Sequence, residues 1–108
     1  MKESSQTWCP AIELNETDKD LILKAEIPGV EIKDLNISAE SKYISISGIH
    51  NRHQKAKEKE VIPSQLHYGQ VDCNVSLPQP IQINHIRAEL IDGLLTITMP
   101  KVKIASTV

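Results

Sequence analysis

The sequence predicts an antiparallel β-sandwich of about seven to eight short strands, with an immunoglobulin-like architecture. Apolar and polar residues alternate in short runs, turn-forming residues separate the runs, and no stretch has the 3.6-residue periodicity of an amphipathic helix. The chain has 108 residues, enough for one domain and too few for two. Since it has no phenylalanine, one tryptophan and two tyrosines, its core must be built from aliphatic side chains. The abundant β-branched residues favour strands.

Four strands are predicted in the N-terminal half, at 11–16, 21–27, 35–40 and 43–49. A polar run ends the first strand, and Pro28-Gly29 ends the second because proline has no N–H to donate and glycine tolerates a positive φ. Residues 30–34 are expected to form about one helical turn. The third and fourth strands have only Ser41-Lys42 between them and form a predicted hairpin.

The C-terminal half contains the remaining predicted strands. Val61-Ile62 is expected to form a short strand that Pro63 ends, and 70–77 alternates over its whole length. Another strand is expected within 83–91, and 94–99 is the last. Asp92-Gly93 is a hairpin dipeptide between these two, with a positive φ expected at Gly93 and Leu95 expected in the core.

Composition excludes several classes of function. The net charge of −2 with only two arginines argues against nucleic-acid binding, and there are too few aromatic residues for base stacking. No apolar run is long enough to span a membrane, and the N-terminus lacks the features of a signal peptide. We therefore expect a cytoplasmic protein without nucleic-acid or integral membrane partners.

Few residues suggest catalysis or metal binding. No nucleophile elbow, zinc-protease motif or phosphate loop occurs, so neither enzymatic activity nor a cofactor is expected. His50 and His53 lack further ligands nearby in the sequence and are interpreted as solvated loop residues. Cys9 and Cys73 do not make a disulfide framework and lack the Cys-x-x-Cys spacing of a redox pair, so Cys73 is predicted to be a small buried apolar residue. The charged run 52–60 is either a solvated face or an arm that reaches a partner subunit.

Three blocks, in order and spacing, resemble the α-crystallin domain of the small heat-shock proteins. The first includes Pro28, Gly29 and Gly48. The second leads from Tyr68-Gly69 to Leu77-Pro78. The third, the most specific, is Ala88-x4-Gly93-x-Leu95 followed by Pro100-Lys101. The phrases at 10–14 and 21–26 are most similar to the bacterial branch, above all the cyanobacterial one.

The resemblance implies an ATP-independent holdase, which binds partly unfolded proteins and suppresses their aggregation. It implies a client- or tail-binding groove between two edge strands, formed by Leu35, Ile37, Ala39, Ile86, Ala88 and Leu90. It also implies a homodimer in which a loop strand at 58–62 pairs with the partner's first strand. The interface residues would be Trp8, Ile12, Leu14, Glu58, Glu60, Val61, Ile62 and Cys73. The resemblance also implies a structural role for the motif positions, which are Pro28, Gly29, Gly48, Ala88, Gly93 and Leu95.

The sequence departs from the family pattern in places. Val71, Cys73 and Val75 stand where the family usually carries Phe-x-Arg-x-Phe, so the arginine of the dimer interface is absent. We expect a short flexible arm at 1–7, a domain at 8–101 and a short tail at 102–108. Val102-Lys103-Ile104 is either a tail motif or an extension of the last strand. These short arms favour a dimer over a large oligomer. They also leave an alternative function, a scaffold or co-chaperone of the p23 type that docks on one folded partner.

Overall fold

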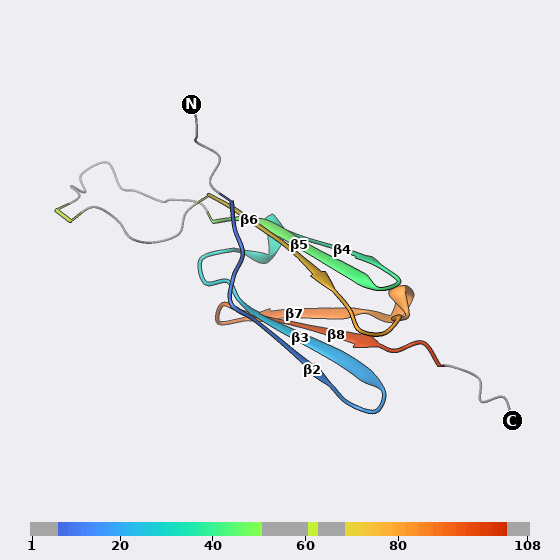
Figure 1. The fold of residues 1–108 in the computed structure, drawn as a ribbon. Coiled ribbons are helices and arrows are strands. Elements are labelled where there is room, and N and C mark those ends of the chain that lie inside the picture. Colours follow the sequence, from blue (N-terminus) through green and yellow to red (C-terminus); the bar gives the residue numbers. More distant parts are fainter. Residues whose placement is uncertain (1–6, 51–60, 63–68, 104–108) are drawn as a thin grey trace, which may run out of the picture.

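The computed structural model describes residues 7–50, 61–62 and 69–103 of the chain. Within them, eight strands form two sheets that pack face to face (Figure 1). Sheet A has the strand order β1-β6-β5-β4, and sheet B has the order β2-β3-β8-β7. The strands are β1 (Thr7–Trp8), β2 (Ile12–Glu16), β3 (Asp20–Glu26), β4 (Leu35–Glu40), β5 (Tyr43–His50), β6 (Gly69–Ser76), β7 (Arg87–Ile91) and β8 (Leu94–Pro100). The predicted β-sandwich is confirmed.

The core lies between the strands that have a neighbour on both sides. Alternate side chains of β3 and β8 in sheet B face those of β5 and β6 in sheet A, as the period of two requires. The most deeply buried of these are aliphatic, with at most 1 % of their surface exposed: Leu21, Leu23, Ala25, Ile44, Ile46, Val71, Leu95, Ile97 and Met99. Burying one such leucine or isoleucine contributes about 1.5–3 kcal/mol. The predicted inward faces of these strands, including the place of Leu95 in the core, are therefore confirmed.

Two tight turns meet at one end of the sandwich. The β7–β8 hairpin turns at Asp92 and Gly93, which have φ values of 52° and 80°, as a two-residue turn of the mirror-image type requires. The amide of Ile27 donates a hydrogen bond of 2.8 Å to the carbonyl oxygen of Gly93. A Cβ on Gly93 would lie 3.0 Å from the Cα of Pro28, so a side chain there would press on the backbone of the other turn. The motif glycine predicted from the sequence thus has a steric role.

The other motif glycines also lie at close approaches. Gly29 has a φ of 91°, and the ring of His50 occupies the space that a Cβ would need. A Cβ on Gly48 would lie 3.1 Å from the carbonyl oxygen of Asp34. That oxygen belongs to the short 3-10 helix η1 (Ile32–Asp34), the helical turn expected before β4.

Some predicted elements differ from the structure. Residues Ile83–His85 form a second 3-10 helix, η2, so β7 begins only at Arg87. Val61 and Ile62 are bends rather than a strand, and they are 88 % and 73 % exposed. Neither residue pairs with a strand of the described chain, so the predicted short strand does not form there. The predicted arm at 1–7 lies outside the described residues except for Thr7, which belongs to β1 and pairs with Gln70, so the arm does not extend to this residue. The whole charged run 52–60 lies outside the described residues.

The Pro100-Lys101 pair joins three segments at the other end of the sandwich. Lys101 Nζ lies 2.8 Å from Glu16 Oε2, and Gln79 Nε2 donates to the same oxygen at 2.9 Å. The Gln82 amide donates to the carbonyl oxygen of Pro100, and the Val102 amide donates to that of Pro80. Since β8 ends at Pro100, Val102 and Lys103 do not extend the last strand, and that interpretation of the tail is wrong.

Replacing Leu95 by alanine should destabilise the fold by about 2–5 kcal/mol, because the transfer free energy is lost and a cavity remains between the sheets. The change is measured by urea unfolding monitored by circular dichroism. Leu94, the neighbouring residue, points outward and is 39 % exposed, so Leu94→Ala is the matched control with a much smaller effect. Equal losses in the two variants would contradict the assignment of the inner face.

Candidate interaction edges

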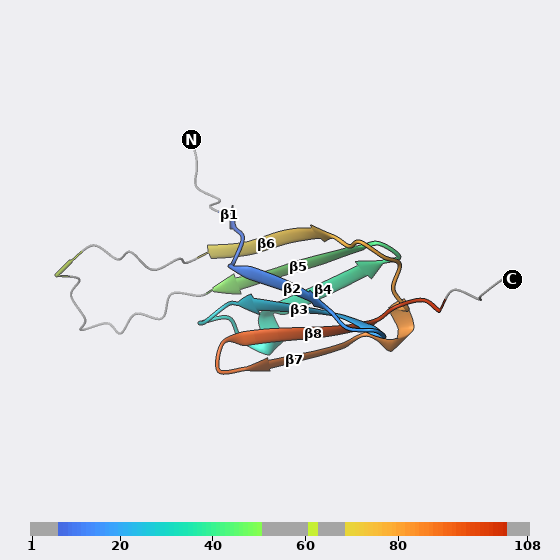
Figure 2. The same ribbon diagram turned by 60° about the horizontal axis from the view of Figure 1, so that its bottom comes forward.

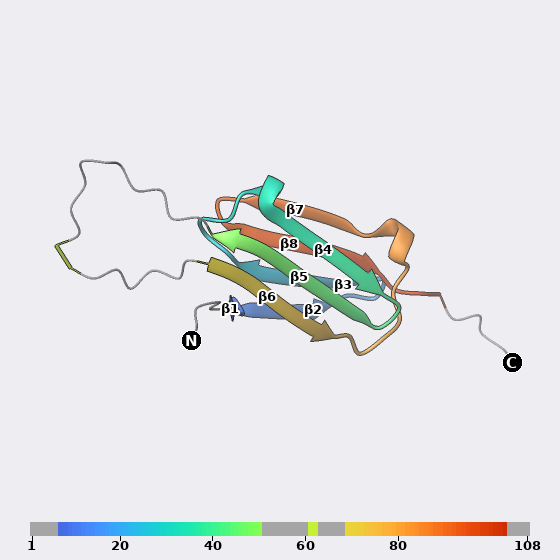
Figure 3. The same cartoon turned by 90° about the horizontal axis from the view of Figure 1, so that it is seen from above.

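The predicted groove residues lie on one side of the sandwich. β4 is the outer strand of sheet A and β7 is the outer strand of sheet B, and both edges lie on the same side when the sandwich is seen from above (Figure 3). Each strand pairs with a neighbour on one side only, β4 with β5 and β7 with β8. The fold thus brings together two segments about fifty residues apart in the sequence, as the resemblance implied.

These two edges carry aliphatic side chains that are only half-buried. Leu35, Ile37 and Ala39 project from β4 toward the core and stay partly exposed. On the other side, Leu90 of β7 and Ile86, the residue just before β7, are partly buried, whereas Ala88 of β7 is exposed. Ala88 pairs with the fully buried Ile97, so it points inward, and its exposure results from its position on an edge. The arrangement offers apolar surface next to unpaired backbone groups, which can accept an extended polypeptide.

The opposite side of the sandwich is crossed by the chain itself. β1 pairs in parallel with the start of β6 in sheet A, and the chain then passes to sheet B, where it forms β2 (Figure 2). Trp8 lies in this crossing, opposite Val71, and is half-buried against the core. Ile12 and Leu14 on β2 are also half-buried. These three predicted interface residues thus lie on one side of the sandwich, together with Cys73 on β6.

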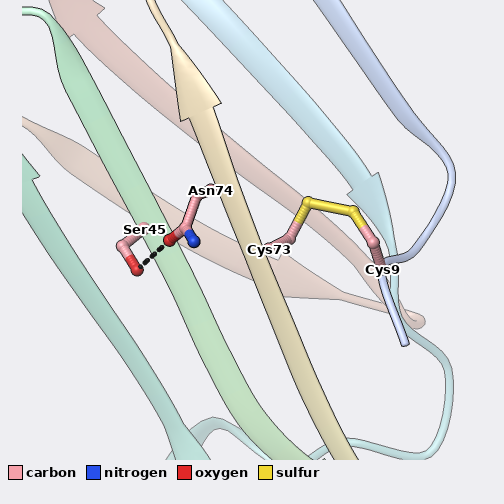
Figure 4. The surroundings of a disulfide bond; sticks show 4 residues. All are labelled: Cys9, Ser45, Cys73 and Asn74. Carbon is pink, nitrogen blue, oxygen red and sulfur yellow. Dashed lines mark hydrogen bonds between the residues drawn. A yellow bond between two sulfur atoms is a disulfide. The ribbon is translucent and has the colours of Figure 1, made fainter. Parts of the chain in front are cut away.

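A disulfide joins Cys9 to Cys73 across this edge (Figure 4). The two Cα atoms are 5.0 Å apart, within the range that a disulfide requires. Cys73 is therefore not simply a small buried apolar residue, and the interpretation that gave the two cysteines no disulfide role is wrong. Alternation correctly indicated the inward side chain of Cys73, which is 5 % exposed, but the sequence separation of 64 between the two cysteines hid their proximity. Beside the disulfide, Ser45 Oγ on β5 donates a hydrogen bond to Asn74 Oδ1 at 2.8 Å.

The remaining candidate residues form no reactive centre in the described part of the chain. No group of three or more potential metal ligands converges within residues 7–50, 61–62 and 69–103. His50 packs over Gly29, whereas His53, Glu58 and Glu60 lie outside the described residues. Neither of the short helices in those ranges is long and apolar enough to cross a membrane.

Glu16, at the end of β2, has a lowered pKa. The main cause is the hydrogen bond and the attraction from the Lys101 ammonium group, with a smaller contribution from the amide of Gln79. The carboxylate therefore stays ionised below its ordinary pKa of 4.5. This interaction fastens the end of β8 to the end of β2.

Comparison with known proteins agrees with this architecture. The profile of the Hsp20/alpha crystallin family matches residues 13–107. Small heat shock protein C2 of Rickettsia felis is 32% identical over 85% of this chain and 60% of its own length. Spore protein SP21 of Stigmatella aurantiaca is 29% identical over 93% of this chain and 59% of its own. The chain thus spans about 60% of the length of these curated relatives.

A solved structure shows the same fold. Heat shock protein 16.0 from Schizosaccharomyces pombe superposes with a TM-score of 0.81 at 27% identity, covering 93% of each chain. The sandwich with its open edges is therefore an α-crystallin domain. The chain belongs to the Hsp20/alpha crystallin family, the small heat-shock proteins. This family is non-enzymatic, and its members are ATP-independent chaperones that form oligomers and bind client proteins. Relatives occur in bacteria, fungi and plants, and two of the plant relatives are chloroplastic, so neither a branch nor a compartment follows.

The Glu16–Lys101 contact should make stability depend on acid pH. Because the pKa of Glu16 is lower in the folded chain than in the unfolded one, its contribution is present above the ordinary pKa and is lost as the pH falls through the folded pKa. Glu16→Gln should therefore melt at a lower temperature than the wild type at neutral pH, and the gap should close in acid. Thermal melts between neutral and acid pH measure the effect.

Glu13→Gln is the matched control, since Glu13 lies on the same strand and accepts a hydrogen bond from Asn15 rather than from a lysine. A gap for Glu16→Gln that stays constant with pH would contradict the electrostatic assignment.

Proposed function

We propose that this protein is an ATP-independent holdase that binds partly unfolded polypeptides at the edges of β4 and β7. The observation that carries the proposal is the juxtaposition of these two edge strands, with half-buried aliphatic side chains beside unpaired backbone groups. Unfolding proteins expose apolar surface and unpaired strand edges of the same chemistry. Covering apolar surface yields about 25 cal/mol per Å², and added strand pairing supplies hydrogen bonds.

Holding a client is a matter of mass action. A protein that binds the unfolded form and not the native form keeps that form from aggregating, without any need for nucleotide hydrolysis. The groove would consist of Leu35, Ile37, Ala39, Ile86, Ala88 and Leu90, as predicted from the sequence. The affinity with the cyanobacterial branch and the cytoplasmic location stay predictions.

We test the groove with two neighbouring residues of β7. Leu90 is half-buried and packs against the core, whereas Ile91 points to the outer face and is 56 % exposed. Leu90→Ser should reduce the protection of a heated model client, and Ile91→Ser should leave it unchanged. Light scattering of the client is recorded below the melting temperature of each variant.

Two outcomes would overturn the proposal. No protection by the wild type at a several-fold excess would exclude the holdase function. Equal loss in both variants, or none in either, would place the client elsewhere. Recovery of one folded partner at fixed stoichiometry from a pull-down would instead support the scaffold alternative.

We also propose a homodimer formed by exchange of the loop strand at 58–62. β2 is the outer strand of sheet B, so its free edge can accept a strand from a partner. Val61 and Ile62 are among the most exposed apolar residues of the described chain, and pairing would cover them. Trp8, Ile12, Leu14 and Cys73 lie on the same side of the sandwich and would line the interface.

Deleting residues 52–62 should convert the dimer into monomers, because the exchanged strand would be lost. Light scattering coupled to size exclusion gives the solution mass. A deletion variant that still has the mass of a dimer would contradict the exchange, and a wild type that is monomeric would contradict the dimer itself.

A further inference from the structure

The segment 7–11, here called the strap, covers part of the free edge of β6. In sheet B the strap is continuous with β2, and the Glu26 amide donates a hydrogen bond to the carbonyl oxygen of Ala11. In sheet A its backbone is held by only two residue pairs, Thr7 with Gln70 and Trp8 with Val71. The disulfide is the covalent link between the strap and β6. The strap is therefore part of a continuous strand at its sheet B end, whereas at its sheet A end two residue pairs and the disulfide attach it to β6.

The strap also lies beside open space. It borders a hollow of about 580 Å³, whose walls include Trp8, Pro10, Pro28 and Leu94. Of the two cysteines of the disulfide, Cys9 is exposed and Cys73 is buried. A soluble reductant can thus approach the disulfide from the side of the strap.

The surface beneath the strap has the features of a strand acceptor. Along β6 the inward residues are Val71, Cys73 and Val75, and the outward residues are polar. β1 already occupies one end of this edge as an extended strand with a large apolar side chain, Trp8, turned against the core. The strand already bound there indicates the kind of ligand that fits, an extended polypeptide with bulky apolar side chains.

From these observations we infer that the Cys9–Cys73 disulfide is a thiol-controlled clip over a second polypeptide-binding edge, formed by β6. When the disulfide is intact, the strap occupies the edge. When it is reduced, two residue pairs and the contacts of Trp8 remain, and an unfolded client competes with the strap for β6. This inference rests on the proposed holdase function and adds to it a second edge and the control of that edge. It concerns a protomer released from the proposed dimer, because that dimer would cover Trp8 and Cys73, and the measurements are therefore made at protein concentrations at which light scattering gives the mass of a monomer.

The chemical step is a thiol–disulfide exchange with a dithiol reductant. A thiolate of the reductant attacks Cys9 Sγ and forms a mixed disulfide, and Cys73 leaves as a thiolate that takes up a proton. The second thiol of the reductant then displaces Cys9, which leaves as a thiol. The protein gains two electrons and two protons, and the reductant departs as its cyclic disulfide.

The single tryptophan of the chain lies on the strap, so its fluorescence reports the opening directly. Reduction with dithiothreitol should shift the emission of Trp8 to longer wavelength and increase its quenching by acrylamide. Hydrogen exchange of the β6 amides should become faster, while the amides of β3 and β8 stay protected. Unchanged fluorescence and exchange on reduction would overturn the clip, and equal loss of protection in β3 and β8 would show global unfolding instead.

Binding is measured with reduced, carboxymethylated α-lactalbumin, an unfolded probe without free thiols. If the strap opens in a minor fraction of the oxidised molecules, the affinity of the reduced protein should be higher by about tenfold or more. In hydrogen exchange, the bound probe should protect 70–76 only in the reduced protein. The variant Cys9→Ser/Cys73→Ala lacks the disulfide, so it should bind the probe with the affinity of the reduced protein. Its affinity should not change when the reductant is added.

The outcomes separate this inference from the proposed function. Equal binding in both redox states, with protection confined to β4 and β7, would preserve the holdase and overturn the second edge. Opening of the strap without binding of the probe in either state would overturn both proposed binding edges. A double variant that binds as weakly as the oxidised wild type would also overturn the inference.

Discussion

The contact between two aliphatic layers is the constraint on which the rest of the structure depends. β3 and β8 on one side and β5 and β6 on the other bury their inward side chains almost completely. The chain has no phenylalanine, so aliphatic side chains fill the space between the sheets. Strands with neighbours on both sides can be covered completely, but the outer strands cannot. The same packing that stabilises the centre therefore leaves half-buried aliphatic residues on β2, β4 and β7.

The outer strands are treated in different ways. β2 alternates its half-buried residues with Glu13 and Asn15 and ends at the exposed Glu16, which is held by Lys101. β4 and β7 stay open on the other side of the sandwich. β6 would be an open edge as well, but β1 pairs with its start and a disulfide secures that pairing. The fold thus places polar residues on β2, leaves β4 and β7 open, and covers the start of β6 with a covalently attached strand.

Alternation in the sequence predicted the strands and their inner faces because this pattern is local. Leu95 and Gly93 could be placed for the same reason, since a two-residue turn fixes the register of the strands beside it. Contacts between distant segments were beyond the reach of such patterns. The disulfide depends on how the strap crosses from one sheet to the other, and Lys101 meets Glu16 across 85 residues of sequence. Alternation also gives the face of Ala88 but not its exposure, which depends on the position of β7 at an edge.

The disulfide lies on only one side of the sandwich, and its effect there follows from a general property of strand edges. A backbone edge is selective for conformation rather than for sequence, because its hydrogen bonds go to main-chain groups of any extended segment. An open edge is therefore as ready to bind its own chain as a foreign one, and occupancy depends on the local concentration of each competitor. The disulfide fixes that competition in favour of the strap by making the strap's attachment covalent. The edges of β4 and β7 have no such link in the described chain, so the two sides of one fold respond to different conditions.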